Sequence, residues 1–114
     1  MSDETVETVE TDVDPFAALL AAVKTYLQIT WTDEETDARL TELMNAGREY
    51  IDQKLWENAD YAIPGLPRTL LFEYVRYARD GALDVFENNY RSLILAMQHE
   101  RMVTAYVSTA TDTV

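Results

Sequence analysis

Apolar residues recur every three to four positions in four stretches of the chain, which is the period of an amphipathic α-helix. The first stretch begins at Asp14-Pro15, where Asp can cap a helix and Pro is tolerated at the first helical position. Its apolar stripe consists of Phe16, Leu19, Leu20, Val23, Tyr26 and Leu27. The β-branched segment 29–32 then interrupts the pattern and predicts a connection.

A second helix is expected to open at Thr32, because Thr32 and Glu35 have the spacing of a capping box. In that motif the Thr hydroxyl accepts the backbone N–H of Glu35, and the Glu carboxylate reaches back. The apolar stripe consists of Leu40, Leu43, Met44, Gly47, Tyr50, Ile51 and Leu55. Glycine costs about 1 kcal/mol relative to Ala inside a helix, so Gly47 on this stripe predicts close approach of another helix.

Residues 59–67 contain two prolines around Gly65 and predict a loop, with Pro67 as the first residue of a third helix. The stripe of that helix consists of Leu70, Leu71, Tyr74, Val75, Ala78, Ala82, Val85 and Phe86. Gly81 weakens it, and the pair at 88–89 either ends it or caps a fourth helix.

The fourth helix is expected from about Tyr90 to Val103, and it has two apolar sides. Tyr90, Leu93, Ile94 and Met97 lie on one side, whereas Leu95, Met102 and Tyr106 lie on another. A small bundle buries only one side of a terminal helix. The second side therefore indicates either a subunit contact or a helix that is more deeply buried than the pattern suggests.

These patterns predict an all-α fold, a small bundle of about four helices in one domain covering residues 14–103. Residues 1–13 alternate Thr and Val with acidic side chains that repel one another, so a disordered acidic tail is expected. Residues 104–114 are biased to Thr, Ala and Ser, which predicts a mobile C-terminal tail.

The formal net charge of the chain is −12, and residues 1–14 contribute half of it with six acids and no Lys or Arg. Such a balance disfavours tight phosphate binding, which needs clustered basic residues, and suits solubility or a basic partner. The chain has no Cys, so disulfides and thiolate metal sites are excluded. The longest apolar run, 16–23, is far shorter than the roughly 20 residues of a membrane span, and the acidic start is unlike a signal peptide.

Residues that could carry chemistry are few. His99 is the only histidine, whereas a zinc site usually needs several His or Cys ligands, so an exposed or interface position is expected. No strand-turn-helix elbow surrounds any serine. Carboxylate pairs such as Glu49 and Asp52 are interpreted as solubilising charge on polar helix faces. We therefore expect a protein that is not an enzyme and that carries no metal or cofactor.

A candidate interface lies on the third and fourth helices. Arg and Tyr are enriched at protein interfaces, although interspersed acids also allow ordinary salt bridges along the helix faces. The candidate residues for an oligomer or partner interface are Tyr74, Arg76, Tyr77, Arg79, Arg91, Leu95, Arg101, Met102 and Tyr106.

Four segments in this order resemble a known family. They are VKTYLQIT (23–30), DEETDARLTELMNAGREYIDQKL (33–55), GLP (65–67) and LLFEYVRYARDGALDVFENNYRSLIL (70–95). Over about residues 15–103 the chain is similar to the head–tail connector, or head-completion adaptor, proteins of long-tailed bacteriophages. The motifs are degenerate and none is catalytic, and the segment 44–48 departs from the commoner aliphatic-Ala-Ala-Arg run.

The resemblance implies a virion subunit that forms a dodecameric ring beneath the portal, at the head–tail interface, after assembly in the host cytoplasm. Its partners would be other copies of itself, the portal protein and the next head-completion or tail protein. DNA would pass through the lumen without specific binding, and no membrane would be involved. An alternative is an acidic regulatory or inhibitor protein that binds a basic partner. The concentration of charge in the N-terminal segment, rather than in rows on one face, favours the connector.

Overall fold

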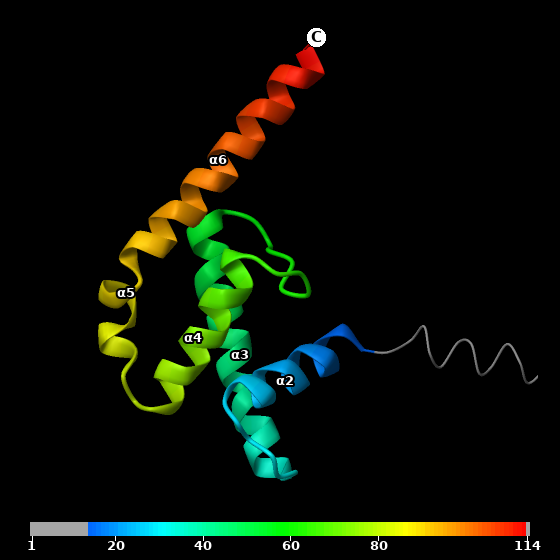
Figure 1. Cartoon of the computed structure of the whole chain (residues 1–114), viewed down its shortest axis with the longest axis vertical. Coiled ribbons are helices and arrows are strands. Elements are labelled where there is room, and N and C mark those ends of the chain that lie inside the picture. Colours follow the sequence, from blue (N-terminus) through cyan, green and yellow to red (C-terminus); the bar gives the residue numbers. More distant parts are fainter. Residues whose placement is uncertain (1–13, 114) are drawn as a thin grey trace, which may run out of the picture.

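The computed structural model describes the backbone of residues 14–113 and the side chains of residues 14–107. Within this range the fold is all-α, a small helical bundle, as the sequence predicts (Figure 1). The predicted disordered segment 1–13 lies outside the described residues. In chain order the elements are α2 (Pro15–Tyr26), α3 (Glu34–Leu55), α4 (Leu66–Arg79), the 3-10 turn η1 (Leu83–Val85), α5 (Phe86–Asn89) and α6 (Arg91–Thr113).

The first helix starts where the sequence predicts. Asp14 caps α2 by accepting the backbone N–H of Phe16 at 3.1 Å, and Pro15 is the first helical residue. Leu19 and Val23 of its apolar stripe are buried in the core. The chain leaves the helix through Gln28, which has a φ of 63°, and then buries Ile29 beneath the connection to α3.

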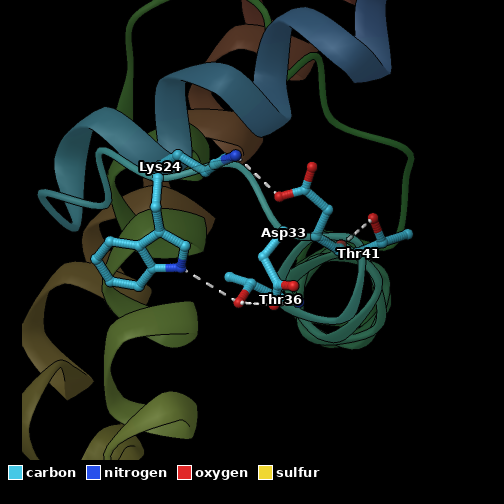
Figure 2. A network of polar contacts seen from close by, with 6 residues as sticks. Lys24, Asp33, Thr36 and Thr41 are labelled. Atoms are coloured by element: carbon cyan, nitrogen blue, oxygen red, sulfur yellow. Dashed lines mark hydrogen bonds and ion pairs between the residues drawn. The ribbon is translucent and has the colours of Figure 1, made fainter.

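The start of α3 differs from the prediction by one residue. Asp33 is the cap, and its Oδ2 accepts the backbone N–H of Thr36 at 3.0 Å and the Thr36 hydroxyl at 2.8 Å (Figure 2). The predicted Thr32–Glu35 capping box is therefore wrong. The carboxylate of Asp33 satisfies the free N–H at the third helical position, and a charged acceptor suits the positive end of the helix dipole.

The same corner of the molecule joins α2 to α3 through polar contacts. Lys24 Nζ on α2 lies 2.9 Å from Asp37 Oδ1 in the first turn of α3. Figure 2 shows this ion pair together with the Thr41 hydroxyl, which donates to the backbone carbonyl of Asp37 at 2.8 Å. The connection between the two helices is thus fixed by side chains from both of them.

Helices α3 and α4 pack along each other at a glycine, as the sequence predicts. A Cβ atom built on Gly47 would lie 2.8 Å from both Leu71 Cδ1 and Tyr74 Cδ1 of α4. Real Cβ atoms do not approach other atoms so closely, so only glycine permits this helix separation. Leu40, Met44 and Ile51 of α3 lie in the same buried layer.

The helix that corresponds to the third predicted helix begins one residue earlier than expected and ends well before Phe86. Helix α4 starts at Leu66, so Pro67 is its second residue rather than its first. It ends at Arg79, and Gly81, with a φ of 71°, turns the chain. The predicted stripe that continued through Ala82 and Val85 is therefore wrong, and the Val85 side chain is 42% exposed. The turn instead returns Phe86 to the core, where its ring packs against α3 and α4.

Helix α6 is longer than predicted. It begins at Arg91 and stays helical to Thr113, so the expected end at Val103 is wrong. Ile94 and Met97 pack in the core, whereas residues 102–107 are exposed. Figure 1 shows the C-terminal half of α6 projecting beyond the other helices. The predicted mobile segment 104–114 has a helical backbone as far as Thr113, and its side chains from 108 onward lie outside the described residues.

Candidate functional site

Two tyrosines of the predicted interface, Tyr74 and Tyr77, belong to an aromatic cluster inside the bundle. Phe86 is 2% exposed and lies at its centre. The ring centroids of Tyr50, Tyr74, Tyr77 and Tyr90 lie 6.0, 5.5, 5.6 and 5.1 Å from that of Phe86. Tyr74 and Tyr77 are half-buried, and their rings pack against Phe86 within the chain.

A buried carboxylate lies beside this cluster. Glu73 is 6% exposed, and its Oε1 accepts the Tyr90 hydroxyl at 2.7 Å and Arg76 Nε at 3.1 Å. Burial, followed by the hydrogen bond to Glu73, raises the pKa of Tyr90 to about 12. The hydrogen bond to Glu73 likewise raises the pKa of the Arg76 guanidinium. Arg76 forms a salt bridge with Glu73 of the same helix. Such a helix-face salt bridge was the alternative to a partner contact in the sequence analysis.

Four tyrosines should make the protein sensitive to alkali. Burial raises the pKa of Tyr50, Tyr61, Tyr74 and Tyr90, and acceptor carboxylates add to the shift at all of these except Tyr74. Above about pH 10 the unfolded chain loses these phenolic protons while the folded chain keeps them. The contribution of these four tyrosines to the free energy of unfolding should therefore be constant up to about pH 9 and fall as the pH rises through 10 to 12.

Urea unfolding at a series of alkaline pH values, read by circular dichroism, tests this expectation. Phenolate absorbance should rise in two steps, the second coinciding with the loss of helix. A urea midpoint that does not change between about pH 9 and pH 11 would contradict the assignment of these four tyrosines as protected groups.

The second apolar side of the last helix is on the surface. Leu95, Met102 and Tyr106 are 57%, 59% and 75% exposed, and Val103 and Val107 extend the same surface. We call these five residues the outer face of α6. Deeper burial, the alternative interpretation of this pattern, does not hold for them. The outer face lies opposite Met97, which packs in the core, so α6 is apolar on both sides.

The remaining predicted interface residues lie on α4 and α6. Arg79 and Arg91 are exposed at the end of α4 and the start of α6. Arg101 is half-buried, and its Nε lies 3.3 Å from Glu57 Oε1, which links α6 to the chain just after α3. The structure thus separates the predicted set into half-buried tyrosines, the ion-paired Arg76 and Arg101, the exposed Arg79 and Arg91, and the residues of the outer face.

Two grooves flank the connection between α3 and α4. One, of about 560 Å³, lies between residues 57–67 and α6 and includes Ile63, Met97 and Arg101 in its lining. The other, of about 400 Å³, lies between the start of α2, the middle of α3 and residues 59–62. Its lining is formed by Pro15, Phe16, Ala18, Leu19, Arg48, Ala59, Asp60, Tyr61, Ala62 and Arg68.

The connection is held by a residue pair that the sequence analysis missed. Asp52 Oδ1 accepts the Tyr61 hydroxyl at 2.7 Å and the backbone N–H of Ala59 at 3.0 Å. Tyr61 is 6% exposed and part of the core. Asp52 was interpreted as solubilising charge, but its carboxylate fixes the loop. An aromatic residue inside a Pro- and Gly-rich segment was the available signal for such an anchor.

The described residues lack a metal-ligand cluster and a membrane-spanning helix. They contain no group of three or more His, Cys, Asp or Glu side chains arranged to hold a metal ion. No helix within residues 14–113 combines the length and apolarity of a membrane span. His99 is exposed on α6, one of the two positions expected for it.

Comparison of the chain with known proteins found no matching protein family, no matching curated protein and no matching solved structure.

Proposed function

We propose that this chain is a structural virion protein, a subunit of the ring that joins the portal of a long-tailed bacteriophage to its tail. The observation that carries the proposal is the outer face of α6. Met102 and Tyr106 are more than half exposed, and the C-terminal half of α6 projects beyond the bundle in Figure 1. An apolar surface of this kind on a small domain marks a protein contact.

A closed ring of identical subunits needs two different complementary patches on each copy. The outer face of α6 supplies one of them. Exposed apolar side chains outside α6 include Trp31 and Tyr26, which are 50% and 44% exposed and are available for the second. We propose a dodecamer on the portal, with the next head-completion or tail protein bound to its distal surface.

The charge of the chain suits a channel through which DNA moves. A net charge of −12 disfavours tight binding of phosphates, so DNA would pass through the lumen without specific binding. The same acidity favours a second candidate function, an acidic regulatory or inhibitor protein that binds a basic partner. The two proposals differ in the surface used, since a basic partner would not need the outer face of α6.

The test is binding of the full chain to an assembled portal from the same genome, measured by analytical ultracentrifugation and imaged by electron microscopy. We expect a ring on the portal. The double substitution Met102→Ser with Tyr106→Ser should weaken ring formation by about thirtyfold or more, because removal of a single buried interface anchor already costs about 2 kcal/mol or more.

The matched control is Leu83→Ser with Val85→Ser, which also removes two exposed apolar side chains but lies away from α6. This variant should bind the portal as the unchanged protein does. Absence of binding to a correctly assembled portal would overturn the connector proposal. Equal loss in both double variants would show that the outer face of α6 is not the specific contact.

A further inference from the structure

The groove between α2, α3 and residues 59–62 contains two arginines. Arg48 extends from α3 and Arg68 from α4, and both are half-buried. The guanidinium of Arg48 lies 5.5 Å from the centroid of the Phe16 ring, and that of Arg68 lies 4.8 Å from the centroid of the Phe72 ring. Stacking on rings fixes the position of each cation while leaving N–H donors available.

The partners of these arginines are neutral. Arg48 Nη1 donates to Asn45 Oδ1 at 3.2 Å, and Arg68 Nη1 donates to the backbone carbonyl of Tyr61 at 2.8 Å. Neither forms an ion pair with a carboxylate whose side chain the structure describes, whereas Lys24, Lys54, Arg76 and Arg101 each do.

Their burial distinguishes them from the other arginines without a carboxylate partner. Arg39, Arg79 and Arg91 are exposed, so water can solvate their charges. A half-buried guanidinium is less well solvated and gains more from an anionic partner. Two such cations facing one groove, in a chain of net charge −12, indicate that the groove receives carboxylates.

Part of the wall of the groove is apolar. Phe16, Leu19 and Ala62 contribute to it. The acid in the lining, Asp60, already accepts the backbone N–H of Ala62 at 3.0 Å. A ligand that matches this surface carries acidic side chains and small apolar side chains in alternation.

The chain itself contains such a ligand immediately before the groove. Residues 1–13 carry five acids and no Lys or Arg, and Val9 and Val13 alternate with Glu10 and Asp12. Pro15 and Phe16, which follow this segment after Asp14, line the groove. Glu10 and Asp12 precede Asp14 by four and two residues, about 13 and 7 Å of extended chain. A short tether of this kind gives an effective concentration on the order of millimolar.

We propose that the segment 1–13 of the same chain docks in this groove, with Glu10 and Asp12 paired to Arg48 and Arg68 and the valines against the apolar wall. This contact is independent of the outer face of α6, and it is expected in the isolated protein without any portal.

The experiment uses a nitroxide spin label on a single cysteine, introduced as Thr8→Cys, since the chain has no native Cys. Amide signals of the ¹⁵N-labelled full chain are then measured by NMR. We expect broadening at Arg48, Tyr61, Ala62 and Arg68. The double substitutions Glu10→Gln with Asp12→Asn, and Arg48→Gln with Arg68→Gln, should each abolish it.

The matched control is Arg79→Gln with Arg91→Gln, which removes two arginines outside the groove and should leave the broadening unchanged. The first acidic double variant alters no residue of the described fold, so its result does not depend on stability. Broadening that is absent from the groove, or that persists in either double variant, would overturn the proposal. Broadening seen only between spin-labelled and ¹⁵N-labelled molecules in a mixture would also overturn it, since the occupant would then be another copy.

Discussion

Replacement of Phe86 by Ala is expected to lower the free energy of unfolding by about 3–5 kcal/mol, the usual cost of deleting a buried aromatic ring. Phe86 is 2% exposed, and four tyrosine rings surround it within 6.0 Å between centroids. Removal of the ring would leave a cavity that these rigid side chains cannot fill by small movements.

The effect should be large for a second reason. Helix α5 has four residues, and Phe86 is its only buried one. Its ring is therefore the main attachment of the segment between α4 and α6 to the core. Urea unfolding monitored by circular dichroism measures the loss, and near-ultraviolet circular dichroism reports the tyrosine cluster directly.

The control is Val85→Ala, a neighbouring apolar residue that is 42% exposed. Exposed positions usually change stability by about 0.5 kcal/mol or less. If the Phe86 and Val85 variants lost similar amounts, Phe86 would not be the centre of the cluster.

Replacement of Gly47 by Leu is expected to destabilise the protein by about 3 kcal/mol or more, although Leu is a far better helix former than Gly. The first added atom would already lie 2.8 Å from Leu71 Cδ1 and Tyr74 Cδ1. Leu71 is fully buried, so it cannot move aside without disturbing the α3–α4 contact.

The control for this variant is Ala46→Leu, an exposed position on the same helix. It should be within about 0.5 kcal/mol of the unchanged protein. Thermal and urea unfolding of the two variants separate the helix propensity of Leu from its steric effect. A Gly47→Leu variant as stable as the unchanged protein would mean that α3 and α4 are not in close contact at this position.

Most of the helix positions could be predicted from the sequence because they depend on local signals. The Asp14-Pro15 start and the period of the stripes at Leu40, Met44 and Ile51 require no knowledge of distant residues. The helix boundaries could not be predicted to the exact residue. Thr32 and Asp33 are both good caps, and the choice between them depended on which side chain reached Thr36.

The break between Asp80 and Phe86 shows why the third helix was predicted too long. The apolar spacing through Ala82, Val85 and Phe86 fits a helix as well as it fits a helix followed by a turn. Only the position of Tyr50 and Tyr74, brought together by the α3–α4 contact at Gly47, determines where the Phe86 ring is buried. A contact between residues so far apart in sequence leaves no local pattern.

The candidate site divides in the same way. The two-sided apolar pattern of α6 could be predicted from spacing alone, and the structure places Leu95, Met102 and Tyr106 on the surface. The roles of Tyr74, Tyr77 and Arg76 could not be predicted, because the type of a residue does not show whether its partner lies in the same chain. Arg48 and Arg68 come from two different helices, so no local pattern in the sequence predicts that they line one groove.

An acidic, all-helical chain with few turns could be predicted from the sequence, because helix period, capping residues and net charge are local or additive properties. Which aromatic and basic side chains are buried or paired inside the bundle, and which remain available for a partner, depends on the tertiary structure. The physical reason is that burial and pairing depend on helix packing, and that packing is set by contacts such as Gly47 with Leu71 and Tyr74. What remains available is the outer face of α6 and the two cations of the groove.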